Sequence, residues 1–259
     1  MTPVFYSIIS IFLMTTSASY FTDLFQEDIV WYKNRNAAPC TKYKCKWPKQ
    51  GNHTVVPYVI SARYSKPQIT SILKGFSEKT CVKFVLRTNQ RDYINIFSGY
   101  GCWSFVGRLR GKQPLSLNKY LCMYTKVMQH EFLHALGFLH EHSRSDRNEH
   151  VKINWHNIRK GKARNFSMLK TINYNISYDY NSVMQYQNKA FSKNGAPTIV
   201  VRDDLTRVLG KKKSMSDSDY ARVNMLYECC KYIQINSLRV YTFMSHQCLN
   251  ILHVISYHV

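Results

Sequence analysis

Three histidines and a glutamate stand close together in a stretch that begins at His130 and reads His-Glu-x-x-His-x-x-Gly-x-x-His-Glu. On a helix, His130 and His134 project from the same face, and this spacing allows two imidazoles to bind one zinc ion. Glu131 lies beside the first histidine, where its carboxylate can reach a zinc-bound water without binding the metal. Gly137 can adopt the positive φ that ends a helix, so the chain can return His140 to the metal.

Three neutral ligands with a fourth position left open are typical of a catalytic zinc site rather than a closed structural one. The sequence therefore predicts one catalytic Zn²⁺ as the cofactor. The alternative is a chance match, since a bare His-Glu-x-x-His can occur on an ordinary helix. The glycine and the third histidine, both in register, make that alternative remote.

The composition limits the class of protein. The chain has 259 residues, enough for one large domain or two small ones, and 45% of them are hydrophobic, enough for a packed core. Its eight cysteines include no Cys-x-x-Cys pair. This argues against a thiolate zinc site or a thioredoxin-type motif and favours disulfides formed in an oxidising compartment.

The N-terminus also indicates secretion. Residues 4–14 form an apolar run that is too short to span a bilayer, and small residues follow it up to Ser19. We predict a cleaved signal peptide over residues 1–19, although no Lys or Arg precedes the apolar run; a buried N-terminal segment is the alternative. The expected location is extracellular, with storage in secretory granules before release. No later segment is long and apolar enough to cross a membrane.

The formal net charge is +21, but the basic residues are scattered, and the only tight run is at residues 211–213. Nucleic acid is not the expected partner, because a secreted protein rarely meets it. An acidic extracellular protein would benefit more from this positive field. A solvated basic surface with no specific role is an equally good interpretation.

Hydrophobic periodicity gives a coarse outline of the fold. Strands are expected at residues 54–60, 82–86 and 93–97, the first of them at a sheet edge because it contains Pro57. Helices are expected from Lys66 onward and across residues 126–136. A capping box at residues 216–219 predicts the start of a last helix.

The zinc stretch continues as Glu-His-Ser-Arg-Ser-Asp-Arg from Glu141 to Arg147, and here the chain resembles the astacin family of secreted zinc endopeptidases. Residues 182–186, Ser-Val-Met-Gln-Tyr, are similar to the Met-turn of that family, with Gln185 in place of its histidine. Residues 102–108 are similar to the edge strand beside the family's substrate cleft. The resemblance covers residues 24–230.

The resemblance implies a role for each matching residue. His130, His134 and His140 would be the zinc ligands, and Glu131 the general base. Tyr186 would be a fifth, weaker ligand that moves away to stabilise the oxyanion, and so both a metal-binding and a catalytic residue. Met184 would pack beneath the site. An extended substrate would pair with the edge strand residues Cys102, Trp103, Ser104, Phe105 and Val106.

The resemblance also implies that the enzyme is made as a latent precursor. Asp28 occupies the place of the aspartate that family pro-segments hold on the zinc, although Glu27 stands where the family has glycine. Residues 20–35 would be the pro-segment, cut by an activating protease near Arg35. The new N-terminus at residue 36 would lie near Glu141, for which the alternative is a surface ion pair with Arg144.

Disulfides implied by the resemblance join Cys102 to Cys122, and Cys81 to either Cys229 or Cys230. The remaining implied pair, Cys40 with Cys45, looks like the extra pair of the six-cysteine astacins, a subgroup that includes the hatching enzymes of fish. The catalytic domain would span residues 36–230, followed by a tail of unknown role at residues 231–259.

The resemblance implies an α+β fold, with a twisted mixed sheet and two long helices in the N-terminal half. An irregular C-terminal half with a final helix would face it across the zinc cleft. We expect a secreted, monomeric zinc endopeptidase that acts on an extracellular protein, with egg-envelope proteins as one candidate. The alternatives are a digestive or matrix-processing protease of the same family, an inactive binding protein that retains the fold and, most remotely, a basic carbohydrate- or nucleic-acid-binding module.

Overall fold

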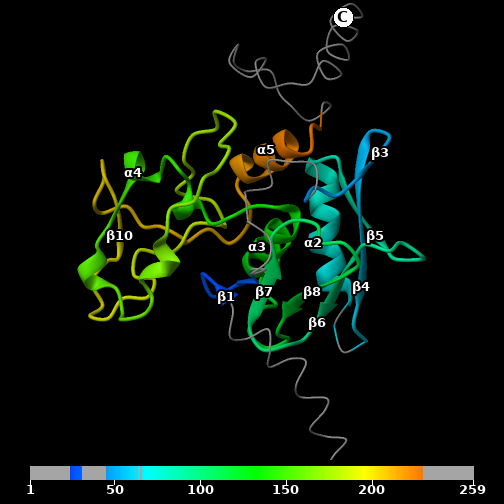
Figure 1. Cartoon of the computed structure of the whole chain (residues 1–259), viewed down its shortest axis with the longest axis horizontal. Helices are drawn as coiled ribbons and strands as arrows, with labels where there is room; N and C mark the ends of the chain where they lie inside the picture. The colour runs from blue at the N-terminus through cyan, green and yellow to red at the C-terminus, as the bar shows by residue number, and fades with distance from the viewer. Residues whose placement is uncertain (1–23, 31–44, 63, 65, 230–259) are drawn as a thin grey trace, which may run out of the picture.

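The structure, a computed structural model, describes residues 24–30, 45–62, 64 and 66–229 (Figure 1). Several features expected from the sequence lie outside these residues: the signal peptide at 1–19, the cleavage site at Arg35, the new N-terminus at 36, Cys40, Cys230 and the tail at 231–259. Among the described residues, no helix is both long and apolar enough to cross a membrane.

A mixed β-sheet forms most of the N-terminal half (Figure 1). Its order is β1-β2-β7-β8-β6-β4-β3, and β5 also pairs with β4. The strands are β1 (Leu24–Phe25), β2 (Ile29–Val30), β3 (Lys49–Gln50), β4 (His53–Ile60), β5 (Val82–Leu86), β6 (Tyr93–Phe97), β7 (Cys102–Phe105) and β8 (Lys112–Leu117). Strands β5, β4, β6 and β8 run parallel, whereas β7 is antiparallel to β8.

The prediction that Pro57 marks an edge strand is wrong, because β4 lies inside the sheet. Thr54 pairs with β5 on one side and β3 on the other, and Tyr58 pairs with β5 on one side and β6 on the other. Strand β3 reaches only to Thr54 and β6 begins only at Tyr58, so Pro57 lies in the gap between these two partners. A residue without an N–H is tolerated at such a gap, since no ladder hydrogen bond is lost there.

Two helices cover the sheet, as the apolar spacing predicts. Helix α2 (Lys66–Lys79) buries Ile69, Leu73 and Phe76 in the main core. Helix α3 (Thr125–Leu136) contacts β7 and β8 and is buried along most of its length. Gly137 has a φ of 110° at the end of α3, and its N–H bonds to carbonyls of the last turn. The predicted helix end is therefore confirmed, and its cause is the left-handed conformation that glycine adopts without strain.

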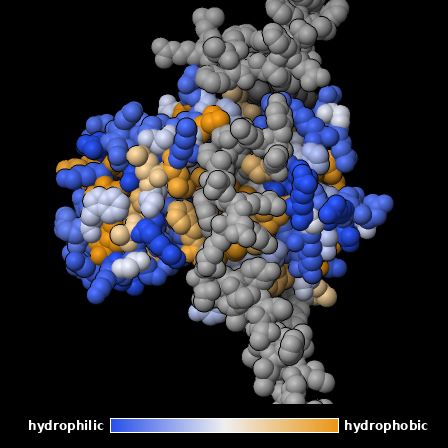
Figure 2. All heavy atoms as spheres, in the orientation of Figure 1, coloured by the Kyte–Doolittle hydropathy of each residue, from blue (hydrophilic) through white to orange (hydrophobic). Residues whose placement is uncertain are grey.

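The C-terminal half is less regular, as expected. It consists of short elements followed by a final helix: η1 (Glu141–Ser143), α4 (Arg147–His150), β9 (Val151–Ile153), η2 (Trp155–Asn157), η3 (Ala163–Phe166), β10 (Ile199–Val201) and α5 (Asp217–Leu226). It has its own small apolar core, which includes Val151, Phe166 and Ile199. The predicted capping box of Ser216 and Asp219 opens α5. Figure 2 shows hydrophilic side chains over much of both halves, with hydrophobic ones between them.

Two disulfides tie these elements together. Cys81, just before β5, bonds to Cys229, just after α5, and Cys102 bonds to Cys122 ahead of α3. Closing loops of 148 and 20 residues in the unfolded chain would stabilise the fold by about 5 and about 3 kcal/mol in the chain-entropy model. Cys45 is also disulfide-bonded.

Candidate active site

Helix α3 and the glycine that ends it bring three histidines together. His130 Nε2 lies 3.1 Å from His134 Nε2 and 3.2 Å from His140 Nε2. Asp28 joins the cluster, and one potential ligand atom from each of the four residues lies within 4.8 Å of the others. Tetrahedral zinc with bonds of about 2.0–2.1 Å separates its nitrogen ligands by roughly 3.3 Å. The spacing of the cluster therefore fits one zinc ion.

The other ring nitrogens indicate the tautomer of each histidine. Every Nδ1 faces an oxygen that can only accept a hydrogen bond, so every Nδ1 carries the proton. These oxygens are the carbonyl of Val183 (2.9 Å from His130), the carbonyl of Phe138 (2.7 Å from His134) and Gln26 Oε1 (2.6 Å from His140). Three Nε2 lone pairs then point at one another, an arrangement that a cation between them would stabilise.

The protonation states around the cluster also suit a metal ion. Burial and the nearby His130 hold the pKa of His134 well below its usual value, so its imidazole is neutral. Burial, and then the charge of Asp28, raise the pKa of Glu131. Burial would also raise the pKa of Asp28, but the histidines overcome it and hold this pKa far below its usual value. A neutral imidazole and an ionised carboxylate are both ligands that zinc binds.

Two orphaned oxygens support the same conclusion. Asp28 Oδ1 and Glu131 Oε2 are buried and have no hydrogen-bond partner within the described part of the chain. A buried carboxylate oxygen normally has a partner, because its desolvation is otherwise unfavourable. A metal ion and its water would supply the missing partners.

The expected pro-segment lies directly on the histidines. Asp28 Oδ2 is 3.1 Å from His130 Nε2 and 3.0 Å from His140 Nε2. Strand β2 pairs parallel with β7, where Ile29 faces Ser104 and the Ser104 N–H donates to the Asp28 carbonyl. Strand β2, part of the expected pro-segment, thus occupies the side of β7 that faces away from β8. Val106 lies beyond the end of β7, which reduces the expected five-residue edge strand to four residues.

Glu27 adopts the backbone conformation that the family's glycine would provide. Its φ is 71°, and the φ of Gln26 before it is 54°. Left-handed backbone conformations are unfavourable for residues other than glycine, so this turn is strained. An exposed ion pair joins Glu27 to Lys162. The replacement of glycine therefore does not prevent Asp28 from reaching the histidines.

Tyr186 lies beside the cluster with its hydroxyl directed at Gln26, in the expected pro-segment. The Tyr186 hydroxyl donates to the Gln26 carbonyl at 2.7 Å. Its ring centroid lies 4.0 Å from that of His142 and 4.7 Å from that of His140. Burial and the charge of Asp28 raise its pKa well above the usual value, so the phenol remains a neutral donor. Met184 is buried in the main core, and its carbonyl accepts the Glu141 N–H at 3.0 Å.

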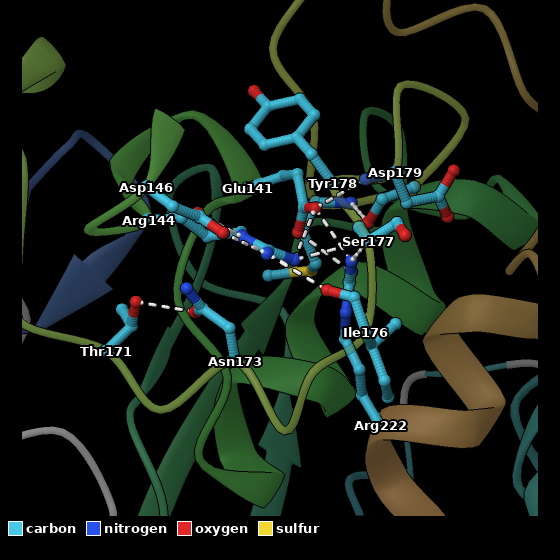
Figure 3. Close-up of polar contacts among 12 residues, drawn as sticks. Glu141, Arg144, Asp146, Thr171, Asn173, Ile176, Ser177, Tyr178, Asp179 and Arg222 are labelled. Atoms are coloured by element: carbon cyan, nitrogen blue, oxygen red, sulfur yellow. Dashed lines mark hydrogen bonds and ion pairs between the residues drawn. The ribbon is translucent and has the colours of Figure 1, made fainter. Parts of the chain in front are cut away.

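Glu141 is buried in an ion-pair network (Figure 3). Its carboxylate accepts two hydrogen bonds from Arg222, at 2.7 and 2.8 Å, and one from Arg144 at 3.2 Å. The Asp179 N–H donates to it as well, at 2.7 Å. The alternative partner named from the sequence, Arg144, is therefore present, but Arg222 makes the closer contact and was missed. The expected contact with the new N-terminus stays a prediction, since residue 36 lies outside the described residues.

Helix α5 binds residues that contact two of the histidines, His130 and His140. Asp219 accepts hydrogen bonds from the Ser182 hydroxyl at 2.6 Å and from the Val183 N–H at 3.1 Å, and the Val183 carbonyl accepts from His130. Arg222, one turn later, binds Glu141, the neighbour of His140. In sequence, Asp219 reads only as part of a capping box, and no local pattern links Arg222 to Glu141.

We predict that Arg222→Met lowers the free energy of unfolding by about 3 kcal/mol, because it leaves the buried Glu141 carboxylate short of a partner. Chemical denaturation followed by circular dichroism would measure the change. Arg159→Met is a matched control, because Arg159 is exposed in the same half of the chain. Equal stability of the two variants would contradict the assignment.

Comparisons with known proteins agree with this site. The sequence model of the astacin peptidase family matches residues 40–228. The chain is 44% identical over 213 residues to the low choriolytic enzyme of Oryzias latipes, an alignment that covers 80% of this chain and 79% of that protein. It is 41% identical over 182 residues to zinc metalloproteinase nas-6 of Caenorhabditis elegans, covering 68% of this chain and 53% of that one.

A solved structure shares the fold. High choriolytic enzyme 1, a hatching-enzyme zinc protease from Oryzias latipes, superposes with a TM-score of 0.71 at 43% identity, covering 75% of this chain and all of that one. Fold, site and comparisons together define a zinc metalloendopeptidase with one catalytic zinc ion. The chain belongs to the astacin family.

Proposed function

We propose that His130, His134 and His140 hold the zinc ion and that Glu131 is the general base of peptide hydrolysis. The observation that carries this proposal is the convergence of three Nε2 atoms whose Nδ1 partners are all hydrogen-bond acceptors. Zinc in such a site lowers the pKa of a bound water to about 7 and polarises the scissile carbonyl.

The other residues of the site handle the proton and the developing charge. The Glu131 carboxylate accepts the proton of the attacking water and passes it to the departing amine. Tyr186 donates its hydroxyl hydrogen to the oxyanion. This role is supported by the hydrogen bond that the Tyr186 hydroxyl already donates to the backbone carbonyl of Gln26. Met184 and its neighbours provide the packed floor of the site.

The uncut chain is latent in this proposal. The Asp28 carboxylate occupies the position between His130 and His140 where water and substrate would otherwise come, and β2 covers β7. Cleavage near Arg35 by a second protease removes residues 20–35. The active enzyme then spans residues 36–230 and offers β7 to an extended substrate.

The proposed substrates are extracellular proteins, and egg-envelope proteins are the first to test because the relatives include choriolytic and hatching enzymes. The proposed location is extracellular, after loss of residues 1–19.

A cavity of about 1040 Å³ lies between the start of α3 and the segment that follows Tyr186, and residues 211–213, all lysines, line it. This basic wall favours acidic side chains in the substrate.

The function is tested by mapping the new N-termini that the activated, secreted protein produces in egg-envelope and other extracellular protein mixtures. Incubations with a zinc chelator, and with the chelator followed by added zinc, run in parallel. We expect cleavage that stops with the chelator, returns with zinc and is enriched near acidic residues. Cleavage that persists without zinc would overturn the proposal, and binding without cleavage would indicate an inactive protein.

A further inference from the structure

The side chain of Gln26 fills a small polar pocket beside the histidine cluster. Gln26 is buried, with only 1% of its surface exposed. Its Oε1 lies 2.6 Å from His140 Nδ1, and its Nε2 donates to Ser143 Oγ at 2.7 Å and to the Asn165 carbonyl at 3.1 Å. The three groups that form the pocket come from the segment after α3, from η1 and from η3.

This pocket is complementary to a carboxamide. His140 Nδ1 carries a proton when Nε2 faces the metal, so it donates to the amide oxygen. Ser143 Oγ and the Asn165 carbonyl then accept the two amide hydrogens. A carboxylate in the same place would set an oxygen against the Asn165 carbonyl oxygen. A hydrocarbon would leave His140 Nδ1 and Ser143 Oγ without their partner, which is unfavourable.

The walls of the pocket are held by contacts that do not involve Gln26. The Ser143 N–H donates to the His140 carbonyl at 3.0 Å, and the Ser143 carbonyl accepts from the Leu169 N–H at 2.7 Å. The Arg147 guanidinium joins η1 to η3, since it donates to the carbonyls of His142 at 2.9 Å and Phe166 at 2.6 Å. These contacts do not need the pro-segment, so its departure would leave them in place, and His140 Nδ1 and Ser143 Oγ would lose the partner that Gln26 supplied.

The pocket also lies next to the reaction site. His140 is a candidate zinc ligand, and Tyr186, whose hydroxyl binds the backbone carbonyl of Gln26, is the candidate oxyanion donor. We propose that in the activated enzyme this pocket is a substrate subsite for a carboxamide side chain, that of glutamine or asparagine. In the latent chain, Gln26 occupies it as a built-in ligand. This inference rests on the proposed function, because it assigns a specificity to the same cleft.

A set of internally quenched peptides tests the subsite by cleavage. One residue is varied among Gln, Glu and Leu at each position along a common sequence, and kcat/KM is measured for the activated protein. We expect one position at which Gln exceeds both Glu and Leu by about tenfold or more. Ser143→Ala should reduce that preference severalfold. Ser145→Ala is the matched control, because Ser145 is exposed on the same segment and bonds to Thr171 instead; it should leave the preference unchanged.

A binding measurement tests it without catalysis. A labelled peptide of residues 24–30 is titrated with the activated protein by fluorescence anisotropy and compared with its Gln26→Glu and Gln26→Leu forms. We expect both substitutions to weaken binding about tenfold or more, and Ser143→Ala to reduce the difference. Equal binding of the three peptides, or zinc-dependent cleavage with no preference for Gln, would overturn the subsite alone. Absence of all cleavage would overturn the proposed function instead, while the peptide titration would still decide the subsite.

Discussion

Replacement of Glu131 by glutamine is expected to lower kcat/KM of the activated protein about a thousandfold, within the range that general-base catalysis contributes. Glutamine has the size and shape of glutamate but cannot accept a proton. Glu131 is 1% exposed, and one of its oxygens has no partner within the described part of the chain. Burial, and then the charge of Asp28, raise the pKa of this carboxyl in the uncut chain.

The same variant should keep its zinc, because Glu131 is not among the four residues of the cluster. Peptide cleavage and zinc content, measured on one preparation, separate the loss of a base from the loss of the metal. Glu78→Gln serves as the control, since Glu78 is exposed on α2 and pairs with Lys74 at the surface. A Glu131→Gln enzyme that keeps more than about a tenth of the activity would exclude this carboxylate as the base.

Replacement of Asp28 by alanine is expected to make the uncut precursor active, at about a hundredfold or more above the wild-type precursor. The Asp28 carboxylate is the only anionic group in the four-residue cluster, and loss of a buried charged contact amounts to about 3–5 kcal/mol. Activity should stay below that of the activated enzyme, because β2 still pairs with β7 and Gln26 still fills its pocket. The measurement is peptide cleavage by precursors in which Arg35 is replaced by glutamine to prevent activation.

Glu27→Ala is the matched control within the same turn. It removes the surface ion pair with Lys162, which contributes no more than about 1 kcal/mol, and it leaves Asp28 in place. Latency should therefore change by no more than about fivefold. If Asp28→Ala leaves the precursor as silent as the wild type, Asp28 is not the residue that keeps the enzyme latent. A double variant with Glu131→Gln should be silent again, which assigns the gained activity to this site.

Local patterns in the sequence predict much of the site. The four-residue spacing of His130 and His134 fixes their common face on α3, and Gly137 ends the helix where a left-handed residue is needed. The capping box of Ser216 and Asp219 forms as predicted, since both hydrogen bonds lie within one turn. Each of these features depends on residues within about ten positions of one another, and helix geometry determines such contacts before any tertiary packing.

Resemblance to a family extends the prediction over longer distances. It implied that Cys81 forms a disulfide with a cysteine at the end of the catalytic domain, with Cys229 and Cys230 as alternatives. The structure contains the bond to Cys229. It also singled out Asp28, although Glu27 departs from the family pattern. Glu27 adopts the left-handed turn with its carboxylate paired to Lys162, which lies 135 residues further along the chain.

The chemistry proposed for this protein can be predicted from its sequence alone: three imidazoles and a carboxylate, spaced so that a helix and the turn after it bring them to one zinc ion. The surroundings of these groups depend instead on tertiary packing. Packing set Pro57 in a gap inside the sheet, placed Arg222 on Glu141 and closed the pocket of Ser143 and Asn165 around Gln26. The last two contacts join residues 81 to 139 positions apart. No periodicity or local motif encodes such pairs, because they depend on how whole elements pack.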